Sequence, residues 1–209
     1  LRQQNALLRS NFLSRLMKGR MDTSIPVQEA LTLYELDFCS DWFGVILFYI
    51  KDLGIFDNSE NGSECEERIK LVYFVIKNVV EELAGQNNKG YVTEIDEMVA
   101  CIVNFKSDGN SSGKQEMTRI ASEAQQFIKN KFGISFSASL SNIYQNLSGV
   151  SKAYQDALEA MEYKLVIGSE SIIHYDDIKD TRHEYYYPIE KEQQMINFIK
   201  LGEFDKAQY

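Results

Sequence analysis

The sequence FGVILFYI, residues 43–50, decides the fold class of this chain. Nearly every position is apolar or aromatic, which predicts a strand that is covered on both faces and therefore lies in the middle of a sheet. It is also the longest apolar run in the sequence. A membrane-spanning helix needs roughly 18 such residues, so a transmembrane segment is not expected within this chain.

The elements that follow this strand predict how the sheet continues. Hydrophobic periodicity indicates a helix, two short strands joined near Asp96, a second helix and a further strand, over residues 66–83, 90–95, 98–105, 117–128 and 134–140. With the central strand they form a split βαβ pattern, which is an antiparallel sheet with both helices on one face. We therefore predict an α+β, ferredoxin-like fold, to which a helix over 150–168 and a strand over 171–175 are added.

Helical segments are predicted on either side of this body. Residues 1–20 are expected to form an amphipathic helix that ends at Gly19, and a proline at position 188 begins another that runs to about residue 201. The predicted parts are an N-terminal helical linker, an α+β domain and a C-terminal helical linker, over residues 1–37, 38–180 and 181–209. The first helix has an apolar stripe that either packs on its own domain or faces a partner; its members include Leu8, Phe12, Leu13 and Leu16.

Charge is unevenly distributed along the 209 residues, which include 22 basic and 31 acidic side chains and have a net charge of −9. Five of the basic residues lie in the first 20 positions, which hold no acid, so the remainder has 17 basic and 31 acidic residues. A body this acidic repels phosphate backbones, and direct binding of nucleic acid by this chain is not expected. The three cysteines are too far apart for a paired zinc motif, which favours free thiols in a reducing compartment.

The motifs that could carry chemistry are weak. GNSSGK, residues 109–114, resembles a P-loop, but it has three residues between its glycines where four are needed, and a flexible loop is expected instead. His174 and His183 lack the spacing of metal ligands, and the acids around Asp176 fit a solvated loop. We therefore predict no catalytic residue, no metal site and no cofactor.

Three segments, taken in order, resemble a known family. They are NFLSRLMKG, VSKAYQDALEAMEYK and YYPIEKE, at residues 11–19, 150–164 and 186–192. Together with the order of strands and helices, they are similar to the degenerate GGDEF-like region of AraC-type transcription regulators from Gram-positive bacteria. The resemblance covers essentially the whole chain and implies the nucleotide-cyclase fold of GGDEF domains.

The resemblance also implies which residues an active cyclase would need. A carboxylate on the first strand would hold magnesium, but Tyr49 occupies the corresponding position and Lys51 follows two residues later. The hairpin segment Glu94–Met98 keeps the acidic pair Asp96 and Glu97 and lacks both glycines, and Ile95 is expected to obstruct the approach of a nucleotide. The resemblance thus argues against the reaction and makes Asp96 and Glu97 ordinary turn residues of a vestigial hairpin.

In such regulators the family pattern implies a non-catalytic region that relays a signal and self-associates. An upstream sensor, which is either a membrane module or a receiver domain, would act on it, and DNA would be bound only by a C-terminal helix-turn-helix domain outside this chain. We expect a homodimer that pairs through the N-terminal stripe, in the cytoplasm and within a longer protein that can be anchored in the membrane. The alternative is a small-ligand sensor that binds a nucleotide in the vestigial cleft.

Overall fold

The computed structural model describes residues 2–21, 27–50, 62–106, 112–167 and 172–179. Its contacts divide the chain into two units, Leu1–Asp176 and Asp177–Tyr209, and the first unit contains the sheet. Lys51, the segment at 186–192 and the helix predicted from Pro188 lie outside the described residues.

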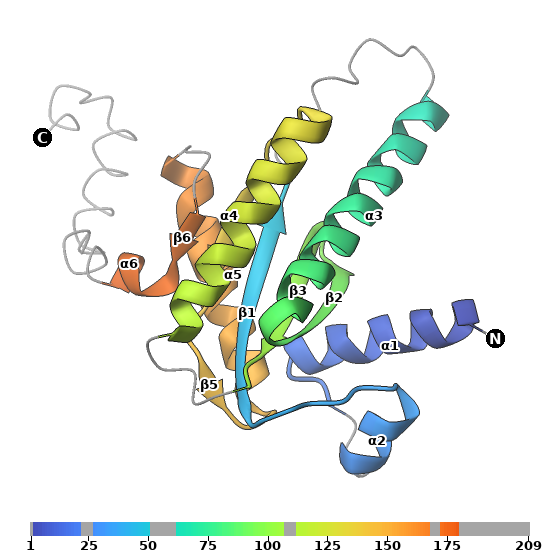
Figure 1. The fold of residues 1–209 in the computed structure, drawn as a ribbon, viewed down its shortest axis with the longest axis vertical. Helices are drawn as coiled ribbons and strands as arrows, with labels where there is room; N and C mark the ends of the chain where they lie inside the picture. Colours follow the sequence, from blue (N-terminus) through green and yellow to red (C-terminus); the bar gives the residue numbers. More distant parts are fainter. Residues whose placement is uncertain (1, 22–26, 51–61, 107–111, 168–171, 180–209) are drawn as a thin grey trace, which may run out of the picture. The chain divides into compact units, whose positions relative to one another are not determined.

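Six strands and six helices are described. In chain order they are α1 (Arg2–Met17), α2 (Val27–Leu33), β1 (Trp42–Tyr49), α3 (Gly62–Asn87), β2 (Lys89–Ile95), β3 (Met98–Asn104), α4 (Ser112–Phe132), β4 (Ser137–Leu140), β5 (Tyr144–Gln145), α5 (Gly149–Ile167), β6 (Ile172–His174) and α6 (Tyr175–Lys179). The strands form one sheet in the order β2-β3-β1-β4-β6, and β5 also pairs with β1 (Figure 1). All pairs are antiparallel except β4 with β6. The predicted α+β fold around a central strand is confirmed.

β1 is buried on both faces, as its composition predicts. Ile46 and Phe48 point into one hydrophobic cluster, while the alternate side chains Phe43, Val45 and Leu47 point into a second. All five side chains are at most 2% exposed. Burial of a side chain of this size contributes about 1.5–3 kcal/mol, so both clusters stabilise the fold substantially.

The two clusters are covered by different helices. α3 and α4 cover the first cluster, and they share one face, as the split βαβ pattern predicts (Figure 1). α1 and α5 cover the second cluster on the opposite face. The expectation of helices on one face is therefore incomplete, because the second face of β1 is equally apolar and would otherwise be exposed to water.

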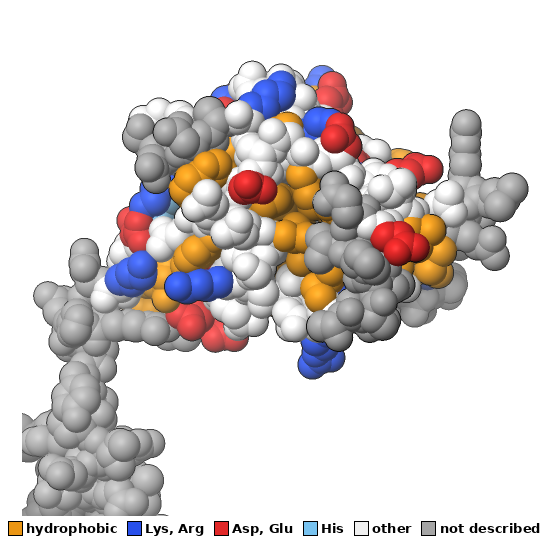
Figure 2. All heavy atoms as spheres, turned by 90° about the horizontal axis from the view of Figure 1, so that it is seen from below, with side chains coloured by type: hydrophobic (Ala, Val, Ile, Leu, Met, Phe, Trp, Pro, Cys, Tyr) orange, Lys and Arg blue, Asp and Glu red, His pale blue; other side chains and the backbone are white. Residues whose placement is uncertain are grey.

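The surface of the described residues is mixed. Figure 2 shows one face, where hydrophobic side chains reach the surface in separate patches and charged side chains lie between them. No helix among the described residues is both long enough and apolar enough to cross a membrane.

Candidate functional site: the hairpin turn and the helix end that it binds

The vestigial hairpin closes with a two-residue turn that is strained. Ile95 pairs with Met98, so Asp96 and Glu97 form the turn, with φ angles of 47° and 62°. Positive φ at both positions is the type I′ geometry, which strongly favours glycine at the second residue. For a side chain as large as that of Glu97, this left-handed conformation costs roughly 1–2 kcal/mol. Such a turn persists when the surrounding structure holds it in place.

Side chains from two helices, and from the residue that follows a third, hold this turn. The ammonium group of Lys18, just after α1, donates to Oδ1 of Asp96 at 2.7 Å. On the other carboxylate oxygen, the hydroxyl of Tyr154 in α5 donates at 3.3 Å. The hydroxyl of Tyr73 in α3 donates to the backbone carbonyl of Glu97 at 2.7 Å. We use the name turn clamp for the five residues Lys18, Tyr73, Asp96, Glu97 and Tyr154.

The way in which α1 ends positions Lys18 for this contact. The backbone N–H of Arg20 donates to the carbonyl of Arg15 at 2.8 Å, and that of Gly19 donates to the carbonyl of Leu16 at 3.1 Å. These two bonds, with Gly19 at a φ of 66°, form a Schellman motif, so the predicted end of the helix at Gly19 is confirmed. A Cβ at Gly19 would lie 2.8 Å from Oγ of Ser151, which shows that α1 ends directly against α5.

The electrostatics of the turn clamp favour a charged carboxylate and neutral phenols. The hydrogen bond from Lys18 lowers the pKa of Asp96, and Tyr154 adds to this effect. Burial, followed by the nearby Asp96 charge, raises the pKa of Tyr154 to about 12. Burial and the nearby charges of Glu94 and Glu97 also raise the pKa of Tyr73. At neutral pH the two hydroxyls are therefore protonated donors and Asp96 is an ionised acceptor.

Asp96 lies in the turn of the hairpin, and its carboxylate also has partners outside the turn. Its carboxylate joins the ends of two sequence-distant elements, α1 and α5, to the hairpin. Ile95 differs from the expectation, because its side chain is 4% exposed and lies in the second hydrophobic cluster, where it does not project into an open cleft. Tyr49, at the end of β1, packs partly buried against the same cluster.

The residues predicted for self-association are mostly inside the chain. Phe12, Leu13 and Leu16 are 7%, 1% and 3% exposed and belong to the second cluster. These three side chains cover β1 and β2 of their own domain, and self-association through the stripe stays a prediction. Leu8 differs, since it is 51% exposed.

The remaining motifs have structural partners. Lys114, the lysine of the P-loop-like segment, forms an ion pair with Asp176, while residues 109–111 lie outside the described part. His174 shares a hydrogen bond of 2.9 Å with the hydroxyl of Thr118. Cys39 and Cys101 are free thiols. No group of three or more His, Cys, Asp or Glu side chains within the described residues could hold a metal ion.

The turn clamp joins residues that are far apart in the sequence. Its polar donors were not identified from the sequence, because Lys18 and Asp96 are 78 residues apart and nothing local links them. One signal was available: the helical stripe of residues 150–165 places Tyr154 inward, and a buried phenol needs a hydrogen-bond partner.

Comparison with known proteins agrees with the fold. Residues 18–163 match the family of the GGDEF-like domain, which is more than half of the chain. The chain is also 21% identical over 209 residues to the uncharacterized HTH-type transcriptional regulator YtdP of Bacillus subtilis (strain 168). That similarity covers 99% of this chain and 26% of the relative, so the chain spans about a quarter of that protein's length. The resemblance to GGDEF-like regions is confirmed: the chain belongs to the GGDEF-like domain family.

Proposed function

We propose that this chain is a non-catalytic signal-relay and self-association domain of a transcription regulator. In this proposal it couples an upstream sensor, attached before α1, to a helix-turn-helix domain in the rest of the parent protein. The membership in the GGDEF-like family and the likeness to a regulator named as HTH-type support the regulatory role. As the resemblance to AraC-type regulators implies, we assign the contact with DNA to the helix-turn-helix domain.

The ion pair between Lys18 and Asp96 carries the proposal. It fixes the end of the helix that would receive a signal to a turn whose backbone is strained. The same carboxylate accepts a hydrogen bond from α5, the helix that leads toward the C-terminal part of the chain. A rotation or shift of α1 would withdraw Lys18, release the turn and alter the support of α5, because hydrogen bonds weaken steeply when their geometry changes.

The absence of cyclase activity is part of the proposal and rests on the residues at the hairpin. The first-strand position that would bind magnesium holds a phenol, that of Tyr49, and the carboxylate of Asp96 is already bound by Lys18 and Tyr154. We expect no magnesium-dependent turnover of GTP by the purified chain. Formation of pyrophosphate or of a cyclic dinucleotide would contradict this part.

Charge reversal in the full-length regulator tests the relay. Lys18→Glu and Asp96→Lys each place like charges together, and each should change the signal dependence of a transcriptional reporter. The double variant restores an opposite-charge pair and should recover part of the wild-type response. Lys106→Glu, which changes an exposed lysine outside the turn clamp, is the matched control. Wild-type reporter responses from both single variants, at equal protein levels, would refute the proposal.

A further inference from the structure

An apolar row runs along α3 beside the residues that fill the core. Leu71, Val75, Val79 and Leu83 recur every four positions, so they lie on one stripe of the helix. The fully buried side chains of this helix come from a neighbouring stripe that includes Val72, Ile76, Val80 and Ala84. Val79 and Leu83 of the first row are partly buried against the same cluster, and Leu71 at its start is 60% exposed.

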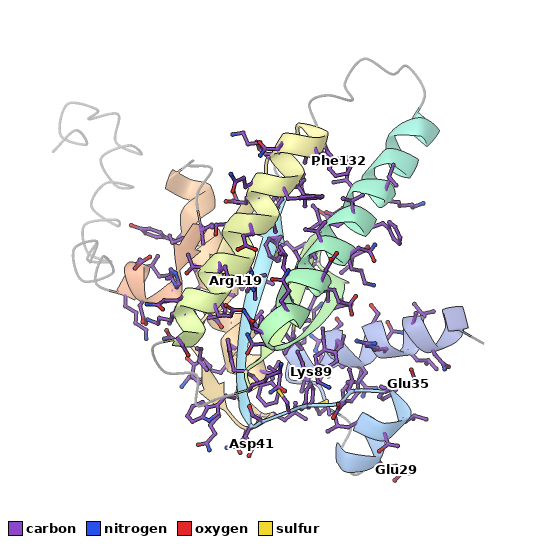
Figure 3. The ribbon with its side chains drawn as sticks, in the orientation of Figure 1. Glu29, Glu35, Asp41, Lys89, Arg119 and Phe132 are labelled. Atoms are coloured by element: carbon purple, nitrogen blue, oxygen red, sulfur yellow. The ribbon has the colours of Figure 1, made fainter. Side chains whose placement is uncertain are left out.

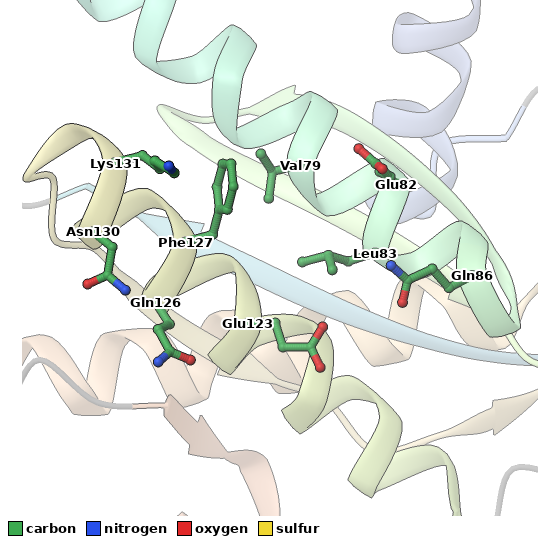
Figure 4. A pocket seen from close by; sticks show the side chains of 9 residues that line it. All are labelled: Val79, Glu82, Leu83, Gln86, Glu123, Gln126, Phe127, Asn130 and Lys131. Atoms are coloured by element: carbon green, nitrogen blue, oxygen red, sulfur yellow. The ribbon is translucent and has the colours of Figure 1, made fainter.

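α4 contributes two aromatic side chains next to this row. Phe127 and Phe132 are 46% and 47% exposed, and their ring centroids are 6.5 Å apart. Between the two helices lies a groove of about 430 Å³, and Figure 4 shows Phe127 facing Val79 and Leu83 across it. Exposed apolar patches of this kind mark binding surfaces more often than isolated exposed residues do.

One end of the groove is closed by a polar network. Arg119 of α4 donates to the backbone carbonyl of Leu83 at 3.0 Å and to Glu116 of its own helix at 2.8 Å. Figure 3 shows Arg119 partway along α4 and Phe132 at the far end of the same helix. The arginine fixes the spacing of the two helices at one end, so the groove is a preformed feature of the surface.

Charges of opposite sign lie at the two ends of the groove. α3 and α4 run antiparallel (Figure 1). Lys131 of α4 and Glu82 of α3 therefore lie on opposite sides of Phe127 along the groove. Figure 4 shows this arrangement, with Lys131 and Asn130 on one side of Phe127 and Glu82 and Gln86 on the other. Both charged side chains are exposed. The groove thus has Lys131 at one end, apolar side chains in the middle, and Glu82 and Glu123 at the other end, where Glu123 forms an ion pair with Arg119.

We propose that a second copy of this chain packs on the α3–α4 groove through a two-fold axis. When the two-fold axis crosses the groove at a right angle, the second copy runs in the reverse direction along it, and Lys131 of each copy lies at the end that holds Glu82 of the other. Phe127 of each copy packs near the apolar rows at the centre. The charge pattern of the groove matches its own reversed image, which selects a second copy over a partner of uniform charge.

The dimensions of the helices agree with such an interface. α4 has 21 residues and is therefore about 30 Å long at 1.5 Å per residue. Two helices of this length side by side provide a face of the size class of stable interfaces, which bury about 800 Å² per partner. This surface replaces the α1 stripe, whose side chains are mostly buried, and the inference rests on the self-association part of the proposed function.

Sedimentation equilibrium of the whole chain tests the surface. The wild-type chain should dimerise, and Phe127→Asp should abolish the dimer while the variant still unfolds in one cooperative transition, because this side chain is half exposed and the fully buried core is unchanged. Leu8→Asp changes the exposed residue of α1 and is the matched control, which should leave the dimer intact. Loss of dimer from Leu8→Asp with none from Phe127→Asp would overturn the proposed surface while the self-association proposal stands.

Charge reversal tests the two-fold arrangement. Glu82→Lys and Lys131→Glu each create two like-charge contacts per dimer, and each should weaken dimerisation about tenfold. An equimolar mixture of the two variants restores both opposite-charge contacts, so a heterodimer should form with nearly wild-type affinity, as should the homodimer of the double variant. Single variants that dimerise like the wild type would overturn the arrangement. A monomeric wild-type chain at millimolar concentration would overturn both this inference and the proposed self-association.

Discussion

The two faces of the sheet are attached to their helices in different ways. On the face covered by α3 and α4, the helices meet the centre of the sheet through apolar side chains. Their polar bonds join the two helices to each other, as at Arg119, or reach the ends and edge of the sheet, as from Tyr73 to Glu97 and between Thr118 and His174. On the face covered by α1 and α5, polar side chains join the helices to the strands. Ser10 bonds to Thr93, Lys18 to Asp96, and the hydroxyl of Ser139 to the carbonyl of Ala157 at 2.7 Å.

This difference indicates separate roles for the two faces of the sheet. Apolar packing is less directional than hydrogen bonds and ion pairs, which depend on distance and angle. The α1 and α5 face therefore holds one defined helix position and is suited to responding when that position changes. The α3 and α4 face supports a constant core and leaves its outer surface available for a partner.

The largest expected effect tests whether α1 belongs to the cooperative core. Leu13 is 1% exposed, so Leu13→Ala should lower the free energy of unfolding by about 2–5 kcal/mol, as Ile76→Ala should on the other face. Leu8→Ala, at a position that is 51% exposed, should cost no more than about 0.5 kcal/mol. Urea unfolding followed by circular dichroism measures all three. An unchanged midpoint for Leu13→Ala would mean that α1 is only loosely attached.

A smaller effect compares the two phenols of the turn clamp. Tyr154 is 2% exposed, so Tyr154→Phe removes a hydroxyl from a buried site and should cost about 1–1.5 kcal/mol. The hydrogen bond of Tyr73 is exposed to solvent, and Tyr73→Phe should cost clearly less. The same unfolding experiment gives both values, and equal costs would remove the distinction between the faces at this turn.

The turn itself should respond in the opposite direction. Glu97→Gly removes the strain of a side chain at a φ of 62° and should stabilise the chain by up to about 1 kcal/mol. Glu94→Gly, three residues earlier in a regular strand, should destabilise it by about 0.5–1 kcal/mol. Thermal unfolding distinguishes the two, and a destabilised Glu97→Gly variant would show that the side chain of Glu97 has a role of its own.

The smallest effect is the pH dependence of the ion pair at Asp96. Its folded pKa is lower than the ordinary value of 3.8, so its contribution is present above that pH and is lost as the pH falls through the folded pKa. Because the carboxylate is partly exposed, we expect at most about 0.5–1 kcal/mol. The difference in stability between the wild type and Asp96→Asn should therefore shrink between pH 5 and roughly pH 2. A difference that stays constant over this range would exclude the ion pair as its source.

Local patterns were sufficient for the order of the longer strands and helices and for the helix end at Gly19, but not for β5 or for α6, where a loop was expected. Both features are local: apolar periodicity distinguishes strands from helices, and glycine is the residue that most readily adopts the positive φ of a helix end. The paired loss of the first-strand carboxylate and of the hairpin glycines was also visible in the sequence. The role of Asp96 was not, because its partners lie 78 and 58 residues away.

The same limit applies to the two helical surfaces. The stripe of Leu8, Phe12, Leu13 and Leu16 shows that α1 must cover something apolar, but the stripe is equally compatible with its own sheet and with another chain. For α3, the sequence shows a broad apolar face without showing which part of it the sheet leaves exposed.

The residues alone establish a double-sided central strand and a split βαβ order, because burial of an apolar strand and local backbone preferences act over a few residues. Only the folded chain shows that α1 returns to the second face, that Lys18 reaches Asp96, that β6 joins β4 in parallel and that Phe127 faces outward. Each of these features depends on contacts between segments that are far apart in the sequence. Such contacts are decided only when the whole chain folds, because the segments then compete for the same apolar surfaces.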